Sequence, residues 1–180
     1  MKTATTSKSA RLGWLWSLVV AVCFATVGCV GGYSFTGASI PPEAKTITVG
    51  TFPNYASTVN PQLSQKLSDG LRNMFASQTS LTVSGADDEG DLSVTGEITA
   101  YETRASALSS SDQVSMNRLS VTIKVKFVNR IDSKADFNQA FTRYKDYNAQ
   151  LDFSAVENSL VEQIVEELCE DVFNKSVVNW

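Results

Sequence analysis

The stretch RLSVTIKVKFVNR, residues 118–130, decides the fold, because its side chains alternate between apolar and polar along its length. One side carries the apolar residues Leu119, Val121, Ile123, Val125 and Phe127. The other side carries the polar residues Ser120, Thr122, Lys124 and Lys126. A repeat of two residues is typical of a strand with one buried and one exposed face. We therefore expect a sheet with one covered face and one open face.

Four further segments have the composition of strands, namely residues 45–52, 80–85, 91–105 and 137–151. In the third of them, the alternation assigns Ala100 to the apolar face and Tyr101 to the polar face. In the last, Tyr144 is out of phase with Phe137 and Phe141, which indicates a bulge or a twist.

Two segments repeat apolar residues with the period of an amphipathic helix. The first follows Asn60, a candidate N-cap, and continues to about Gln78. The second forms the C-terminal part, where Ser154 and Glu157 have the spacing of a capping box. The resulting order, β-α-β-β-β-β-α, predicts an α+β fold. It is a two-layer sandwich in which two helices pack on one face of a mostly antiparallel, four- to five-stranded sheet.

The N-terminus has a different composition, with three basic residues before the apolar run LGWLWSLVVAVCFATV and no acidic residue. This layout is typical of an export signal. The small residues before Cys29 resemble the lipobox of bacterial lipoproteins, although Thr26 replaces the usual leucine. In such proteins the cysteine is diacylated and the peptide before it is removed, so that the cysteine becomes the first residue. We expect a signal peptide over 1–28, an acylated N-terminus and connector over 29–44, and one domain over 45–180. A plain signal peptide, or an uncleaved helix, is the alternative.

Charge and composition argue against several classes of function. Loss of residues 1–28 removes three of the 15 basic residues and none of the 19 acidic ones, which leaves a net charge of −7. Such a chain is a poor candidate for nucleic-acid binding. The absence of histidine removes the commonest general base and metal ligand, so we expect neither an enzyme nor a cofactor. The acidic stretch 87–91 lacks the ligand spacing of a calcium loop. Cys169, at the border of an apolar helix face, is expected to be a buried, inert thiol.

Basic residues nevertheless gather in the strand region of this acidic chain. The eight that lie between residues 104 and 145 are Arg104, Arg118, Lys124, Lys126, Arg130, Lys134, Arg143 and Lys145. Four of them share the polar side of one strand, namely Arg118, Lys124, Lys126 and Arg130. An open sheet face with this charge suits an anionic ligand or partner. A solvated strand kept basic to deter aggregation is the alternative interpretation.

The mature chain resembles the LptE family, the lipopolysaccharide-assembly lipoproteins of the outer membrane. The resemblance lies in GYSFTGASIPPEAKTITVGTFPN, PQLSQKLSDGLRNMFASQTSL, DLSVTGEITAYE and the acidic terminal helix. It implies a non-enzymatic protein that is anchored to the outer membrane through Cys29, binds lipopolysaccharide and plugs the barrel LptD. The candidate lipopolysaccharide ligands are Arg104, Arg118, Lys124, Lys126 and Arg130. A stand-alone envelope lipoprotein that binds an anionic glycan, lipid or protein is the alternative.

The lipobox assignment predicts that Cys29→Ala abolishes acylation, because no other residue of the motif supplies a thiol. Metabolic labelling with a fatty acid is the measurement, and the Cys29→Ala chain should carry no label. Labelling at the level of the unaltered chain would contradict the anchor.

Overall fold

The computed structural model describes residues 40–85, 89–106 and 115–177, all within a compact unit that covers Thr36–Trp180. In chain order the elements are β1 (Thr46–Val49), α2 (Leu63–Gln78), β2 (Thr82–Ser84), β3 (Leu92–Ser106), β4 (Met116–Asn129), the 3₁₀ helix η1 (Ser133–Ala135), β5 (Phe137–Asn148) and α3 (Phe153–Val177). The predicted order of strands and long helices is confirmed. The predicted signal peptide, Cys29 and the connector up to residue 39 lie outside the described residues, whereas the last part of the connector, residues 40–44, is described.

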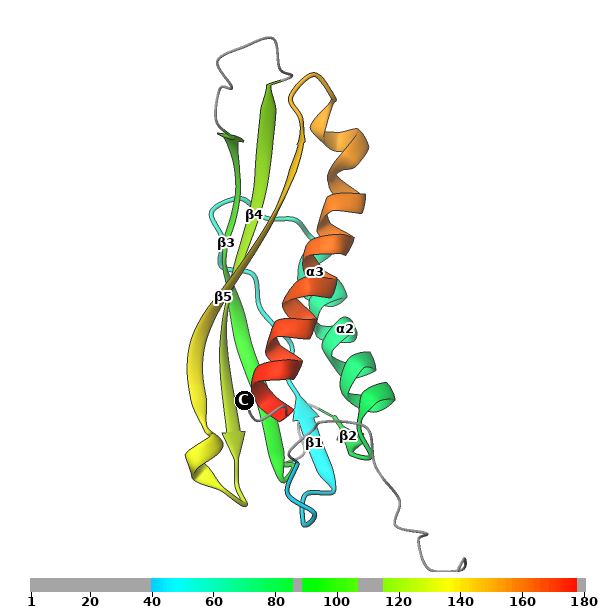
Figure 1. Ribbon diagram of the computed structural model, residues 1–180, viewed down its shortest axis with the longest axis vertical. Helices are drawn as coiled ribbons and strands as arrows, with labels where there is room; N and C mark the ends of the chain where they lie inside the picture. The colour runs from blue at the N-terminus through cyan, green and yellow to red at the C-terminus, as the bar shows by residue number, and fades with distance from the viewer. Residues whose placement is uncertain (1–39, 86–88, 107–114, 178–180) are drawn as a thin grey trace, which may run out of the picture. The chain divides into compact units, whose positions relative to one another are not determined.

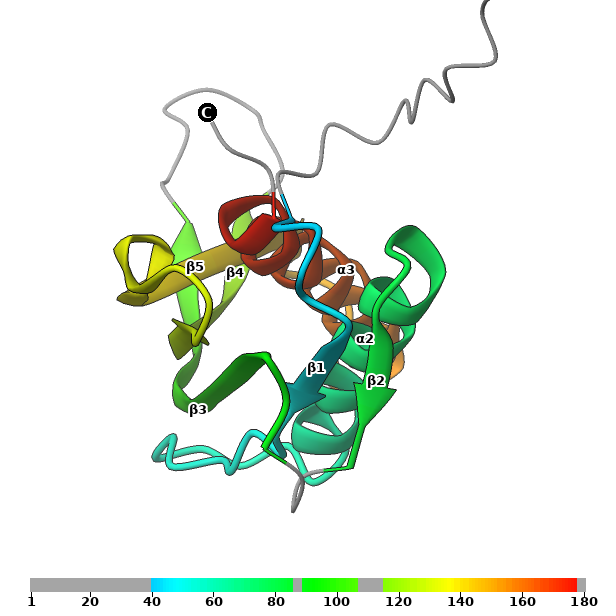
Figure 2. The same ribbon diagram turned by 90° about the horizontal axis from the view of Figure 1, so that it is seen from below.

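The five strands form one sheet in the order β2-β1-β3-β4-β5, and both helices lie on the same side of it (Figure 1). Helix α2 contacts β1 and β2, whereas α3 contacts β4 and β5. Figure 2 shows β1 between β3 and β2. The predicted two-layer α+β sandwich is confirmed. The sheet is mixed, because the crossover through α2 returns the chain parallel to β1.

Strand β4 is the central strand of the antiparallel part, since it pairs with β3 and β5 along nearly its whole length. The side chains of its apolar face are Leu119, Val121, Ile123, Val125 and Phe127, and each is at most 1% exposed. Burial of one such side chain contributes roughly 1.5–3 kcal/mol. The predicted faces of this strand are therefore confirmed.

A register shift in β3 corrects one of the predicted faces. The pairing of β3 with β4 shifts between Ile98 and Ala100. The extra residue turns Tyr101 into the core, where it is 2% exposed, so its assignment to the polar face was wrong. Its hydroxyl donates to Glu157, and burial raises the pKa of this phenol. Asn60 donates to the same carboxylate oxygen at 2.8 Å.

Two local predictions about β5 and α3 are also corrected. The pairing of β5 with β4 continues without a shift, so Tyr144 requires no bulge: it is a residue of the opposite face and is 50% exposed. At the start of α3, Asp152 accepts a hydrogen bond from the backbone N–H of Ser154 at 3.1 Å. The carboxylate of Glu157 instead bonds Tyr101 and Asn60, so it forms no capping box with Ser154.

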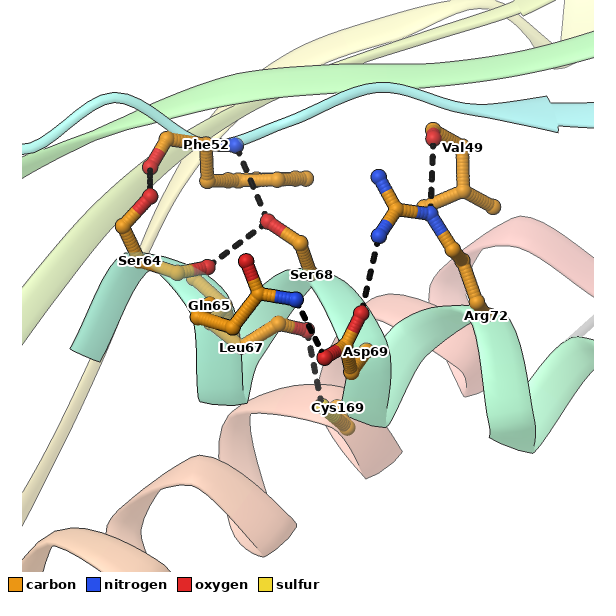
Figure 3. A network of polar contacts seen from close by, with 9 residues as sticks. All are labelled: Val49, Phe52, Ser64, Gln65, Leu67, Ser68, Asp69, Arg72 and Cys169. Atoms are coloured by element: carbon orange, nitrogen blue, oxygen red, sulfur yellow. Dashed lines mark hydrogen bonds and ion pairs between the residues drawn. The ribbon is translucent and has the colours of Figure 1, made fainter. Parts of the chain in front are cut away.

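Helix α2 is attached to the chain that leaves β1 by a network of polar contacts (Figure 3). The backbone N–H of Phe52 donates to the Ser68 hydroxyl at 3.1 Å, and the Ser64 hydroxyl donates to the Phe52 carbonyl at 2.6 Å. Arg72 donates to the Val49 carbonyl at 3.3 Å. The backbone that leaves the sheet is therefore paired with helix side chains, which satisfies groups that strand pairing no longer satisfies.

The same segment packs on β3 at Gly96. A Cβ atom at this position would lie 2.5 Å from the Phe52 ring and 2.3 Å from the carbonyl oxygen of Lys124. Phe52 is fully buried. Glycine is therefore needed at this position for a close approach of ring and backbone, and no unusual torsion angle is involved.

Asp91 fixes the start of β1. Its carboxylate accepts hydrogen bonds from the backbone N–H groups of Lys45 and Thr46 at 2.8 and 3.1 Å, and from the Thr46 hydroxyl at 3.0 Å. The backbone bonds, above all that from Lys45, hold the pKa of this carboxyl below its usual value. The backbone N–H of Gly90 donates to the Thr48 hydroxyl at 3.0 Å. The GDL tripeptide, residues 90–92, thus has a structural role in the docking of β1.

We predict that Gly96→Ala lowers the free energy of unfolding by about 1–3 kcal/mol, because the added methyl group overlaps a backbone carbonyl that cannot move independently of β4. Denaturant unfolding followed by circular dichroism measures the change. The matched control is Gly85→Ala, since a Cβ there meets no atom within 4 Å. Equal stability of the two variants would contradict the proposed contact.

Candidate functional site

The open face of the sheet consists of the side chains of β3, β4 and β5 that alternate with the core. In register across the three strands, Lys126 lies between Thr95 of β3 and Asn138 of β5, and Lys124 lies beside Glu97 of β3. Lys124 and Lys126 are exposed. Within the described part of the chain, both helices lie on the other side of the sheet (Figure 1). The alternation along β4 therefore places these lysines where a ligand has access.

The two lysines line a shallow pocket of about 270 Å³. Its other lining residues are Thr95, Gly96, Glu97 and Asn138. Glu97 is opposite Lys124 in the register, yet no carboxylate of a described residue lies within ion-pair distance of Lys124 or Lys126. Their charges are therefore available to a ligand, and the threonine and asparagine add hydrogen-bonding groups beside them.

Arg118, by contrast, has its charge compensated inside the sheet. Its guanidinium donates two hydrogen bonds to the Asp146 carboxylate, at 2.7 and 2.9 Å, and lies 3.7 Å from the centre of the Tyr144 ring. The bonds from Arg118 lower the pKa of Asp146 and raise that of the guanidinium. Such a fork-to-fork pair with an aromatic contact holds the arginine in place.

The other two predicted arginines also have carboxylate partners. Arg104 forms an ion pair with Glu102 at 2.6 Å, and both side chains are exposed. Arg130 follows the end of β4 and bonds Glu89 at 2.8 Å. Exposed pairs of this kind contribute only about 0–1 kcal/mol to stability, so a ligand anion could compete with the carboxylates.

The predicted basic residues do not form one continuous site. Arg118 and Lys124 are six positions apart in β4, which corresponds to about 20 Å along an extended strand. Between them, the open face has hydroxyl groups, and those of Thr122 and Thr142 lie 2.9 Å apart. Only Lys124 and Lys126 combine proximity, exposure and free charge among the candidates.

Arg143 and Lys145 belong to the covered side of the sheet. Arg143 donates two hydrogen bonds to Asp171 of α3, and Lys145 donates one to Glu167 of the same helix. They join the edge strand β5 to the helical layer and are not part of the open face. Their parity with Phe137 and Phe141 in the sequence is the signal that could have placed them there.

Metal binding and thiol chemistry can be assessed for the described residues. They contain no cluster of three or more Cys, Asp or Glu side chains arranged to hold a metal ion. Cys169 is 1% exposed, and burial, with a smaller effect of Glu166 and Glu170, raises the pKa of its thiol to about 12. The expected burial of this thiol is therefore confirmed, and a raised pKa favours the protonated, less nucleophilic form. Among the described helices, none has the length and apolar character needed to cross a membrane.

The fold is similar to several solved structures of low sequence identity. A hypothetical protein from Chlamydia trachomatis is 10% identical, with a TM-score of 0.51, and the alignment covers 76% of this chain and all of the other. A protein described as a neuraminyllactose-binding hemagglutinin homologue from Helicobacter pylori is 13% identical, with a TM-score of 0.50 and coverage of 79% and 88%. A protein from Xanthomonas campestris is 9% identical, with a TM-score of 0.50 and coverage of 76% and 87%. These similarities concern the fold alone.

Comparison of the sequence itself is more specific. No curated protein sequence matches the chain. A family model described as lipopolysaccharide-assembly matches residues 44–176, which include every described strand and all but the last residue of α3. The chain therefore belongs to the LptE family of lipopolysaccharide-assembly proteins.

Proposed function

We propose that this protein binds lipopolysaccharide on the open face of its sheet and acts with a barrel of the LptD type in transport to the cell surface. The observation that carries the binding site is the pair Lys124 and Lys126, which are exposed, adjacent on one face and without a carboxylate partner among the described residues. The family match supports the assignment to lipopolysaccharide assembly.

The chemistry of the pocket fits a phosphorylated glycolipid. The Cα atoms of alternate strand residues are about 7 Å apart, and lysine side chains are long and flexible. The two ammonium groups can therefore contact one phosphate or two neighbouring ones. Thr95 and Asn138 add hydroxyl and amide groups for the sugar or for phosphate oxygens. Charge-assisted hydrogen bonds to phosphate are the stronger kind of hydrogen bond. Arg104, Arg118 and Arg130 are further candidate ligands, but each would have to exchange its carboxylate partner for the ligand.

The remaining parts of the proposal follow from the family. The protein is a non-enzymatic outer-membrane lipoprotein, anchored through Cys29, and its domain occupies the lumen of the barrel and helps the barrel to assemble. A stand-alone envelope lipoprotein that binds an anionic glycan, lipid or protein would use the same lysines. The two candidates differ in whether a barrel is bound, so each has its own experiment.

The first prediction concerns the ligand. Lys124→Glu together with Lys126→Glu should weaken binding of purified lipopolysaccharide by about tenfold or more, because two attractive contacts become repulsive. Affinity is measured with immobilised lipopolysaccharide, and circular dichroism checks that the domain stays folded.

The matched control reverses two other exposed lysines, Lys45 and Lys134, to glutamate. This control makes the same change in net charge away from the open face. Equal loss of affinity in the two double variants would show that net charge, and not the position of the lysines on the open face, determines binding. Unchanged affinity after reversal of Lys124 and Lys126 would remove them from the site.

The second prediction concerns the barrel. The full chain, extracted from membranes with a mild detergent, should copurify with a barrel of the LptD type, identified by mass spectrometry. An unrelated lipoprotein with the same tag is the control. Recovery of the chain as a monomer, with no barrel bound, would favour the stand-alone lipoprotein.

A further inference from the structure

A groove of about 470 Å³ runs between α2 and α3 and is lined only by residues of these two helices. Its floor is apolar and consists of Gly70, Met74, Val165 and Cys169. A second hollow on α2 shares Gly70, Asn73 and Met74 with the groove and continues it to Gln78. This surface lies on the helical layer, so it is separate from the open face of the sheet.

Gly70 accounts for the shape of the groove. A Cβ atom at this position would lie 3.0 Å from the Cys169 sulfur and 3.6 Å from Val165. The helices therefore approach closely at this point, and Phe75 packs against Phe173 farther along with ring centroids 5.3 Å apart. No side chain rises from position 70 to fill the space above the contact, so Gly70 and Met74 are partly exposed, whereas Val165 and Cys169 beneath them are buried.

The rim of the groove is acidic, and part of its charge is uncompensated. Lys66 pairs with Glu162 at 2.9 Å, and Asp69 pairs with Arg72 at 2.9 Å. Glu166 also lines the groove, but no cation of a described residue pairs with it. The side chains of the lining therefore include three carboxylates and one ammonium group.

The acidic residues of α3 differ between its two sides. Glu167 and Asp171, which point toward the sheet, pair with Lys145 and Arg143. Glu166 and Glu170 have no such partner among the described residues. After burial, the charges of these two glutamates are the further causes that raise the pKa of the Cys169 thiol in the floor. Like charges four residues apart in a helix destabilise it. The chain thus keeps an unfavourable pair of charges beside an apolar groove.

We propose that this groove is a docking surface for a cationic amphipathic helix of a partner protein. An apolar side chain of that helix occupies the floor, and lysines or arginines on its flank pair with Glu166 and Glu170. Cations three or four residues apart on a helix are about 5–6 Å apart, as are the two glutamates. A helix fits because ridges of a third helix pack into the groove between two others. This surface goes beyond the proposed function, since it needs neither lipopolysaccharide nor the open face.

The probe is a synthetic helix of about 18 residues with leucines on one face and lysines beside them, because shorter helices are only marginally stable in water. Fluorescence anisotropy measures its binding to the full chain in a nonionic detergent. Glu166→Lys should weaken binding by about fivefold or more, which corresponds to loss of roughly 1 kcal/mol at an exposed pair. Asn73→Trp, which fills the exposed side of the groove, should also abolish most binding. Hydrogen exchange should slow in α2 and α3 when the helix is bound.

The controls separate docking from general attraction to an acidic protein. Glu43→Lys makes the same charge change at an exposed residue outside the groove, and Ser57→Trp adds the same side chain to an exposed loop. Both should bind the probe as the unaltered chain does. A peptide of the same composition with its leucines scrambled should bind weakly. Equal binding of the scrambled peptide, or equal weakening by Glu43→Lys and Glu166→Lys, would overturn the proposal. These results are independent of the lipopolysaccharide measurement, in which Lys124 and Lys126 are changed.

Discussion

The burial of one side of β4 under the helical layer is the constraint on which the rest of the structure depends. Five alternate positions of this strand carry apolar side chains that are at most 1% exposed, and the strand pairs on both edges along most of its length. Because side chains of a strand alternate, the same packing fixes what the other side presents. A slip of one residue would move Lys124 and Lys126 into the core. The core and the candidate ligand site are therefore two consequences of one register.

The electrostatics of the domain divide along the two layers. On the covered side, Arg143 and Lys145 are neutralised by α3, which joins the edge strand to the helix and also places charges on a strand that could otherwise pair with another chain. On the open face, Arg118 is neutralised by Asp146. Lys124 and Lys126 on the sheet, and Glu166 and Glu170 on α3, are among the described charges without an ion-pair partner. The two pairs lie on opposite layers and have opposite sign, so they are suited to different partners.

The stretch DLSVTGEITAYE, residues 91–102, which resembles the family, has a structural role in this domain. Asp91 binds the first residues of β1, Gly96 makes space for Phe52, and Tyr101 enters the core through a bulge and bonds Glu157. Phe52 in turn bonds α2 through two serines. The strand that resembles the family is therefore the place where β1, α2 and α3 are all joined. Its residues identify the fold, whereas the residues proposed to bind ligand lie on the neighbouring strand.

The sequence by itself determined the order of elements, the two-layer class and the two faces of β4, because hydrophobic periodicity records burial directly. It did not determine the bulge that buries Tyr101, since an extra residue changes the phase without any change in composition. It also grouped eight basic residues in the strand region and placed four of them on one open face without showing which are paired. Only the tertiary structure decided which of them are free, because the carboxylates that neutralise Arg118, Arg143 and Lys145 come from other elements of the fold. Charge pairing between distant segments is set by register and helix packing, and no local pattern encodes it.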